Sequence, residues 1–213
     1  MKNFLILTLL FFLINEKCIP QSINWDENSV GFIVLDDSLY CGTGFVLSNP
    51  NTVITCAHVV DSTKKISFVV FNTEKPFTLE LIKYDINNDI AVLKSQTDIC
   101  QAPLLPDTAF KIYPSQHLFY LGYNISKSSS HNKTLQADKT FVSAVGKTQS
   151  GNKIVDFIEF IGVGIPGYSG CPIFNDNGKV IALMHEAWFK QGVKGGQVQL
   201  INRAFSIKPI FEK

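Results

Sequence analysis

The segment PGYSGCP, Pro166–Pro172, places a serine between two glycines and closes both ends with proline. A serine hydroxyl is a weak nucleophile until a neighbouring base activates it, and the oxyanion that it creates needs backbone N–H donors. Glycine at 167 permits a turn in which its own N–H and that of Ser169 point at one spot. Taken alone, the segment is equally well explained as a tight turn between two strands, because Gly-Tyr-Ser-Gly is common turn chemistry.

Two upstream segments favour the catalytic interpretation. In TVITCAHVV, Thr52–Val60, a strand-like run is followed by Ala57-His58. In NDIAVLK, Asn88–Lys94, an acid, Asp89, comes directly before an apolar strand. The candidate groups therefore occur in the order His58, Asp89, Ser169, which is the chain order of chymotrypsin-type triads. The three pieces together are far more specific than any one of them.

With these motifs in this order, the sequence resembles the trypsin-like serine peptidases, and within them the bacterial high-temperature-requirement type. The resemblance runs along most of residues 30–210 and includes further motifs of that family. They are GTGFV at Gly42–Val46, DINNDIAVL at Asp85–Leu93, LGY at Leu121–Tyr123 and GKVI at Gly178–Ile181. The resemblance implies two packed β-barrels of the chymotrypsin type with the active site in the cleft between them. We also expect no PDZ domain, which such enzymes usually append.

The pattern of short β-rich runs separated by turn residues independently predicts an all-β chain, and no segment holds a long apolar period of 3.6. The expected strands are 29–35, 40–48, 52–55, 68–71, 77–82, 90–93, 118–121, 140–145, 154–161, 171–174, 180–184 and 197–207. The expected loops are 126–133 and 190–196, and one helical turn at most is expected in 209–213. The domain plan is a signal peptide, 1–22, and a peptidase domain, 23–213, made of a first barrel (about 24–99), a proline-bearing connector (100–116) and a second barrel (117–213).

The resemblance implies a role for each candidate residue. Ser169 is the nucleophile, His58 the general base and acid, and Asp89 the carboxylate that orients the imidazole. Gly167 and Ser169 supply the oxyanion-hole N–H groups. Asp61 and Asp85 are rivals for the acid, but the family places it immediately before the apolar strand, which favours Asp89.

The resemblance also places a substrate pocket beside the serine, with Val163, Met184 and His185 as candidate residues. The segment Ile161–Ile165 contains no acid, and a buried substrate Lys or Arg would be left unpaired there. We therefore expect cleavage after small or medium aliphatic side chains, with cleavage after Glu as an alternative because of His185.

The N-terminus predicts export. Lys2 precedes an uncharged apolar run, Phe4–Ile14, which is too short to span a bilayer and is typical of a secretory signal peptide. Removing residues 1–18 deletes two lysines and one glutamate, so the net charge falls from +1 to 0. A near-neutral chain gives no case for a nucleic-acid partner or an anionic membrane surface. We expect a secreted or periplasmic protein whose partner is a protein or peptide substrate, with no stable membrane insertion after signal removal.

The five cysteines predict neither a metal site nor a defined disulfide. They are Cys18, Cys41, Cys56, Cys100 and Cys171. No Cys-x-x-Cys occurs and His58 has another role, so we expect no metal and no cofactor. Buried free thiols that act as small apolar residues are the default.

Two functions remain in competition. The first is an exported serine endopeptidase that works through an acyl-enzyme. The alternative is a catalytically silent binding protein on the same fold, which the retention of His58, Asp89 and Ser169 disfavours. A cysteine-nucleophile relative would need Cys at 169.

Overall fold

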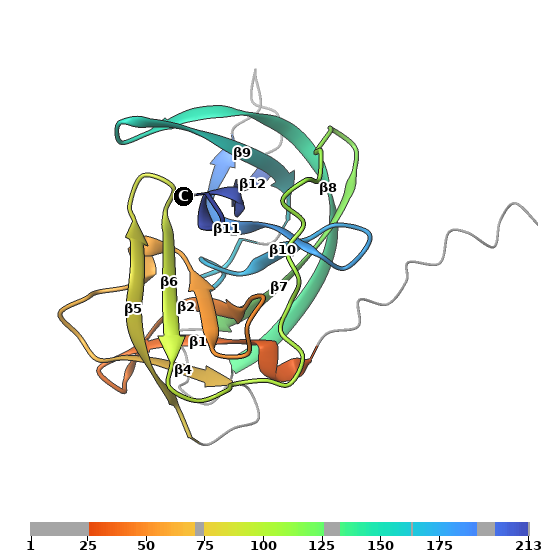
Figure 1. Ribbon diagram of the computed structural model, residues 1–213. Helices are drawn as coiled ribbons and strands as arrows, with labels where there is room; N and C mark the ends of the chain where they lie inside the picture. The colour runs from red at the N-terminus through yellow and green to blue at the C-terminus, as the bar shows by residue number, and fades with distance from the viewer. Residues whose placement is uncertain (1–25, 71–74, 126–132, 163, 191–198, 213) are drawn as a thin grey trace, which may run out of the picture.

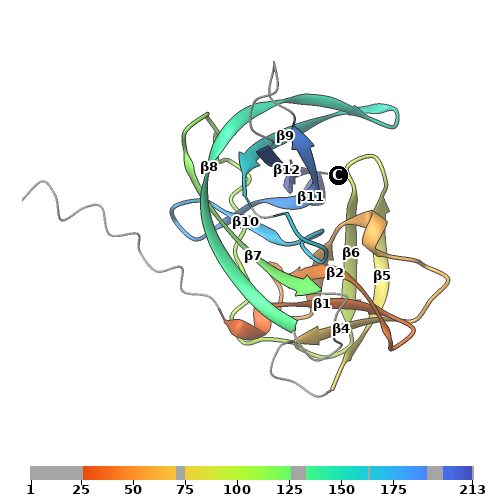
Figure 2. The same ribbon diagram turned by 180° about the vertical axis from the view of Figure 1, so that it is seen from behind.

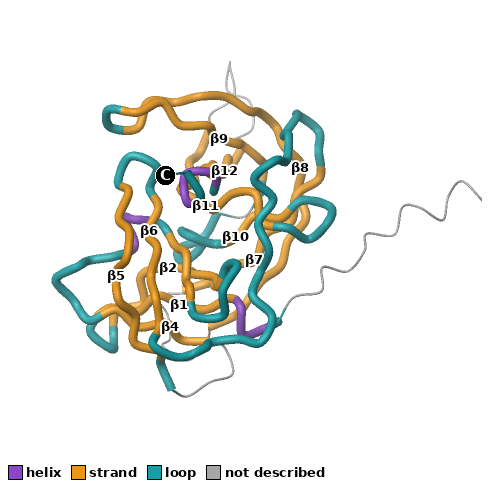
Figure 3. The backbone as a smooth tube through the Cα atoms, viewed as in Figure 1, coloured by secondary structure: helices purple, strands orange, loops and turns teal. Residues whose placement is uncertain are grey.

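The computed structural model describes residues 26–70, 75–125, 133–162, 164–190 and 199–212. Strands make up most of it, and the helices among these residues are short 3-10 turns (Figure 3). The strands form two closed six-stranded barrels, with the first half of the chain in one and the second half in the other (Figure 1). The two-barrel, all-β prediction is therefore confirmed.

The first barrel has the strand order β1-β2-β3-β6-β5-β4, and every neighbouring pair is antiparallel. Its strands are short and rich in β-branched and aromatic residues, which suit a pleated surface with one buried face. Their bounds are β1 (Val30–Leu35), β2 (Leu39–Val46), β3 (Thr52–Thr55), β4 (Ile66–Val70), β5 (Phe77–Asp85) and β6 (Ile90–Ser95).

The second barrel has the order β10-β11-β12-β9-β8-β7, again with antiparallel neighbours. The strands are β7 (His117–Ile125), β8 (Lys133–Ser150), β9 (Lys153–Ile161), β10 (Pro172–Phe174), β11 (Val180–Lys190) and β12 (Gln199–Ser206). β8 curves along the outside of this barrel and continues into a hairpin with β9, as the views from both sides show (Figures 1 and 2). The connector between the barrels is joined to each by an isolated bridge, Leu47 to Leu104 and Pro106 to Val180.

Two apolar clusters fill the molecule. The larger consists mostly of first-barrel residues, but it also includes buried residues of the second half of the chain. These are Leu121, Tyr123, Phe174, Val180, Leu183 and Ile207. The smaller cluster lies in the second barrel around Tyr120, Phe160 and Met184. The first barrel thus shares its core with its neighbour, which fixes how the two barrels face each other.

Several strands are longer than the sequence predicts. β8 was expected only over 140–145, yet it spans Lys133–Ser150, and β11 continues to Lys190 instead of ending at Met184. Much of the added length is polar and exposed, so no apolar alternation marks it. These residues form strand because their backbone is paired: β8 pairs along its length first with β7 and then with β9.

Some expectations concern residues outside those that the structure describes. They are the signal peptide, 1–22, the candidate pocket residue Val163, and most of the two expected loops, 126–132 and 191–196. No helix among the described residues is long and apolar enough to cross a membrane. The expected C-terminal helical turn is present as η4 (Lys208–Ile210).

Candidate active site

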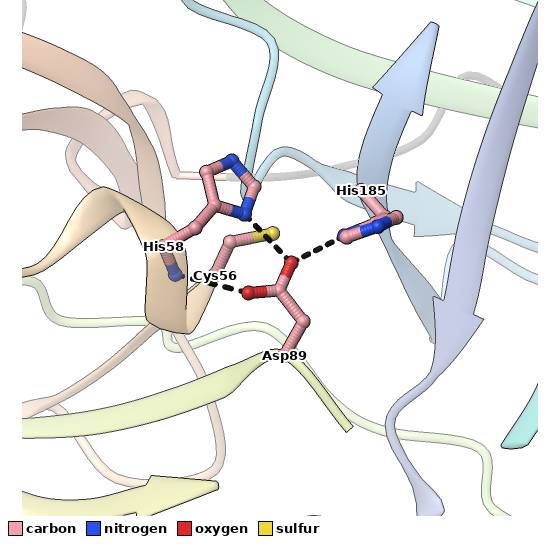
Figure 4. A group of neighbouring side chains, drawn as sticks. All are labelled: Cys56, His58, Asp89 and His185. Atoms are coloured by element: carbon pink, nitrogen blue, oxygen red, sulfur yellow. Dashed lines mark hydrogen bonds and ion pairs between the residues drawn. The ribbon is translucent and has the colours of Figure 1, made fainter. Parts of the chain in front are cut away.

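His58 lies in η3 (Ala57–Val59), a 3-10 turn that follows β3. Its Nδ1 lies 2.8 Å from Oδ2 of Asp89, and its backbone N–H donates to Oδ1 of the same carboxylate at 3.0 Å. The N–H of Ala57 also donates to the backbone carbonyl of Asp89 at 3.1 Å. Asp89 therefore sets both the position of the turn and the orientation of the imidazole that it carries (Figure 4).

Asp89 closes the turn between β5 and β6 with a φ of 51°. This left-handed conformation is uncommon for residues other than glycine, and aspartate is one of the few that tolerate it. Asp85, at the end of β5, accepts hydrogen bonds from the backbone N–H of Asn88 at 3.1 Å and from its side-chain amide at 2.7 Å. Asp85 thus stabilises the turn, and among the hydrogen bonds of the described residues it has none to His58.

Ser169 lies in the loop between β9 and β10, and the loop packs closely against the first barrel. Gly170 has a φ of +86°, and a Cβ at this position would come within 2.3 Å of the Thr43 carbonyl oxygen and 2.4 Å of Thr55 Oγ1. The close approach explains why a glycine must follow the serine. The loop is consequently held at a fixed distance from β2 and β3.

Thr43 joins the serine loop to both barrels. Its backbone N–H donates to the carbonyl of Ser169 at 2.9 Å, and its hydroxyl donates to the carbonyl of Gly167 at 2.6 Å. The same hydroxyl accepts from the backbone N–H of Tyr123 at 3.1 Å. Thr43 is fully buried, so each of these bonds is protected from water.

The backbone N–H groups of Gly167 and Ser169, which the sequence predicts to form an oxyanion hole, have no protein acceptor among the described residues. Gly167 has a φ of +104°. The hydroxyl of Ser169 donates to the carbonyl of His185 at 3.5 Å, and among the described residues it is not hydrogen-bonded to His58. The serine loop thus lies beside the His58–Asp89 pair, but among the described contacts Ser169 and His58 are not hydrogen-bonded to each other.

His185 contacts the same carboxylate from the second barrel. Its Nδ1 is hydrogen-bonded to Oδ2 of Asp89, the oxygen that also faces Nδ1 of His58. Its ring stacks on Phe205 with centroids 4.3 Å apart and lies edge-on to His58 at 5.6 Å. The sequence suggested His185 as a pocket residue. Its ring contacts Asp89, and β11 has a β-bulge between Met184 and Glu186 at this point, while the place of His185 in a substrate pocket stays a prediction.

The charges of the site favour an ionised Asp89. Burial opposes ionisation, but hydrogen bonds from His185 and His58 outweigh it and hold the pKa of Asp89 well below its ordinary value. Burial raises the pKa of the Cys56 thiol far above its usual range, and the nearby Asp89 charge adds to the effect. Burial likewise raises the pKa of Cys171. Both are therefore thiols and not nucleophilic thiolates.

The remaining predicted residues have different surroundings. Met184 is buried in the second-barrel cluster, and its carbonyl accepts from the N–H of Gly170 at 2.8 Å. Val163 lies outside the described residues, so the aliphatic pocket stays a prediction. The cysteines of the described chain, Cys41, Cys56, Cys100 and Cys171, are free thiols.

Sequence reasoning missed the positions of Thr43 and Cys56. Thr43 stands in the family motif Gly42–Val46, whose glycine at 42 has no room for a Cβ, which would lie 2.7 Å from the Ser169 carbonyl. That motif was the available signal for a contact with the serine loop. The Sγ atom of Cys56 lies 3.0 Å from the carbonyl of Met184. The only sign in the sequence that Cys56 lies at the site is its position two residues before His58.

Comparison with known proteins gives one family. The sequence model of the trypsin-like peptidase domain matches residues 42–183. A probable periplasmic serine endoprotease DegP-like from Marinomonas sp. is 28% identical over 151 residues, which cover 71% of this chain and 30% of that protein. The DegP-like relative from Chlamydia trachomatis is 32% identical over 145 residues, covering 67% of this chain and 27% of its own. The chain thus spans less than a third of the length of these relatives.

Solved structures show the same fold. The Rv3671c protease from M. tuberculosis in its active form superposes with a TM-score of 0.66 at 20% identity, covering 87% of this chain and 78% of that one. The MamO protease domain from Magnetospirillum magneticum gives a TM-score of 0.64 at 18% identity, with 86% and 94% covered. At these identities the likeness concerns the architecture alone.

Proposed function

Because the chain belongs to the trypsin-like peptidase family, we propose that it is a serine endopeptidase that uses His58, Asp89 and Ser169 as its catalytic triad. The observation that carries the proposal is the double hold of Asp89 on His58, through Nδ1 at 2.8 Å and the backbone N–H at 3.0 Å. This hold presents Nε2 of His58 as the free nitrogen, which is the tautomer that a general base needs. We also infer that residues 23–213 act as one peptidase domain.

In the proposed reaction, Ser169 Oγ attacks the carbonyl carbon of the scissile peptide bond and passes its proton to Nε2 of His58. Ligand-free enzymes often have long catalytic hydrogen bonds that tighten when substrate binds, which agrees with the open Ser169–His58 contact. The imidazolium is stabilised by Asp89, whose side chain is only 5% exposed. His58 then returns the proton to the leaving amine, and water repeats the sequence on the acyl-enzyme.

The oxyanion of each tetrahedral intermediate would be received by the N–H groups of Gly167 and Ser169, which have no protein acceptor in the described chain. Preorganised donors of this kind are worth about 2.7–4 kcal/mol each. Thr43 acts as a positioning residue here, since it fixes the carbonyls of Gly167 and Ser169 and thereby the directions of the N–H groups beside them.

The proposed substrates are proteins or peptides with a small or medium aliphatic side chain before the cut bond. Support comes from the absence of an acid in Ile161–Ile165. A peptide library profiled at neutral pH measures this preference, and dominant cleavage after Lys or Arg would contradict it.

The activity itself is tested by labelling the purified chain with a fluorophosphonate, which reacts with activated serines. We expect one label per chain, located on Ser169 by mass spectrometry, and none on a Ser169→Ala variant that is equally folded by circular dichroism. Absence of labelling in wild type, alongside a control peptidase that labels, would favour the silent binding protein instead.

We also propose that the protein is exported from the cytoplasm. The DegP-like relatives are named as periplasmic, and the stretch behind Lys2 has the pattern of a signal peptide. We predict that protein purified from the native host lacks residues 1 to about 18–22. N-terminal sequencing decides this, and an intact Met1 would refute it.

A further inference from the structure

Four side chains with metal-binding atoms meet around Asp89. They are Cys56, His58, Asp89 and His185, and one ligand atom from each lies within 4.8 Å of all the others. Figure 4 shows the Cys56 sulfur and the two imidazoles gathered about the carboxylate. The four residues come from the end of β3, from η3, from the β5–β6 turn and from β11, so both barrels contribute.

The cluster holds more donors than the proposed triad uses. Catalysis explains the contact of His58 with Asp89, but it assigns no role to a second imidazole on the same carboxylate oxygen. Nor does it explain the buried thiol of Cys56, whose sulfur lies within 4.8 Å of the ligand atoms of the other three residues. Without a metal, hydrogen bonds hold the four side chains in place. The Nδ1–H group of each imidazole donates to Oδ2 of Asp89, and the Cys56 thiol donates to the carbonyl of Met184.

We propose that Cys56, His58, Asp89 and His185 bind one zinc ion and that this ion reversibly inhibits the peptidase; the inhibitory part rests on the function proposed above. Thiolate, imidazole and carboxylate are the ligands that zinc takes in proteins, and four of them form a closed tetrahedral site. The proposal departs from the expectation of no metal, which considered Cys-x-x-Cys spacing and not donors brought together from four segments.

The charge and proton balance favours a divalent ion. Each neutral imidazole shifts its proton from Nδ1 to Nε2 and offers the freed Nδ1 lone pair, so neither histidine gains or loses charge. The Cys56 thiol releases one proton to solvent, while Asp89 is already ionised. One thiolate, one carboxylate and Zn²⁺ then sum to zero, which suits a site whose two anionic ligands, Cys56 and Asp89, are buried.

The geometry requires only a small adjustment. Ligand atoms about a tetrahedral zinc lie roughly 3.3–3.8 Å apart, given zinc–ligand bonds of about 2.0–2.3 Å. The contacts between Asp89 and the two imidazoles are shorter than this, and no two of the four ligand atoms are more than 4.8 Å apart. Rotation of the exposed ring of His58, whose side chain is 43% accessible, opens the cluster and gives the ion a path from solvent.

Binding would remove the general base. When zinc binds Nδ1 of His58, the hydrogen bond from Nδ1 to Asp89 is lost and the imidazole carries its proton on Nε2. Nε2 is the atom that must accept the proton of Ser169 in the proposed reaction. A neutral imidazole that is protonated at Nε2 accepts nothing from the serine. Zinc and substrate turnover are therefore mutually exclusive, and a chelator restores activity.

Metal binding is tested first without relying on activity. The full chain carrying Ser169→Ala is titrated with Co²⁺, which replaces zinc and gives a thiolate-to-cobalt charge-transfer absorption only when a cysteine sulfur binds it. We expect one ion per chain, with this absorption, and its displacement by Zn²⁺. Absence of the absorption overturns the site, whether or not the chain is a peptidase.

Matched variants locate the ion. Cys56→Ser keeps the size and the hydrogen-bonding capacity of the side chain, and we expect it to abolish the sulfur-to-cobalt absorption. His185→Gln should weaken Co²⁺ binding by about tenfold or more, since even an outer partner of a metal ligand typically contributes 10–100-fold. Cys100→Ser alters another buried thiol, and it should bind as the parent does. Absorption that survives Cys56→Ser, or disappears in Cys100→Ser, would overturn the assignment.

Inhibition is measured on the wild-type chain with zinc chloride and EDTA. We expect zinc to suppress cleavage of a peptide substrate and EDTA to restore it, with the inhibitory zinc concentration rising at least about tenfold in Cys56→Ser. Equal inhibition of wild type and Cys56→Ser would overturn the regulatory proposal. A wild type that binds cobalt but cleaves nothing without zinc would refute the proposed peptidase function and leave the metal site standing.

Discussion

The two barrels have the same strand order but unequal construction. If the strands of each are counted from one to six along the chain, both barrels read 1-2-3-6-5-4. The connection from third to fourth strand carries His58 in the first barrel and Ser169 in the second. One topology, used twice, thus presents the proposed base and the proposed nucleophile on equivalent loops that meet at the junction.

Their differences show what each half contributes. Strands of the first barrel have nine residues or fewer, and its larger apolar cluster reaches into the neighbour. In the second barrel, β8 has 18 residues and β11 has 11, and much of β8 is exposed. The first barrel holds Asp89 and His58 by short hydrogen-bonded turns, whereas the serine loop depends on Thr43 of the other barrel. The first barrel therefore fixes the position of the proposed nucleophile as well as that of its own site residues.

The largest effect should come from removing either of the two equivalent loop residues. We predict that His58→Ala and Ser169→Ala each lower kcat by about 10⁶ and that the double variant loses little more, because the two residues act as a unit. Steady-state kinetics on one peptide substrate measures this. Additive losses would show that the two loops act separately, and the comparison between them would fail.

A smaller effect should come from the contact between the barrels. Thr43→Val keeps the shape of the side chain but removes the hydroxyl that bonds the Gly167 carbonyl and the Tyr123 N–H. We predict a loss of kcat of about 10²-fold, which is what a displacement near 1 Å costs at a reacting group.

The control is Ser95→Ala in the first barrel. Ser95 is also buried, and its hydroxyl accepts from the backbone N–H of Thr97 at 3.2 Å, at the opposite end of β6 from Asp89. It should lower stability with little change in kcat, while equal loss of kcat in both variants would deny Thr43 a positioning role.

The smallest effect concerns the turn that holds Asp89. Burial opposes ionisation of Asp85, but hydrogen bonds from Asn88 and the charges of Lys153 and Lys83 lower the pKa of its carboxyl. We predict that Asp85→Ala lowers the free energy of unfolding by about 1 kcal/mol at pH 7. A lowered folded-state pKa gives stability that is present above the ordinary value of 3.8 and is lost as the pH falls below it.

Urea unfolding at pH 7 and pH 3 checks both the size and the sign, with exposed Asp98→Ala as the control. The difference between Asp85→Ala and wild type should shrink at pH 3, while Asp98→Ala should match wild type at both pH values. A difference that grows at pH 3 would contradict the assigned role.

The sequence predicted the fold where local pattern and family motif agree. The short runs at 52–55 and 90–93 match β3 and most of β6, because buried β-branched residues mark them. It failed for Lys133–Ala137 of β8, since pairing with β7 and not composition makes that segment a strand. The prediction of Asp89 over Asp85 agrees with the contact to His58, although the role of these residues in catalysis stays a proposal.

Other parts of the site could not be predicted. His185 reaches Asp89 because a single-residue bulge in β11 changes the direction of its side chain, and a bulge leaves no periodic signal. Cys56 and His185 are 129 positions apart, so their meeting depends on how the two barrels pack. Long-range placement of this kind follows from the shared core and not from any segment that contributes to it.

The shared apolar cluster also determines at what stage of folding the proposed active site is completed. Tyr123, Phe174 and Ile207 complete a core that belongs mainly to the other half of the chain. A partly folded chain with only its first half in place would carry His58 and Asp89 but no Ser169. The proposed peptidase activity would therefore arise only after both barrels have folded and packed against each other.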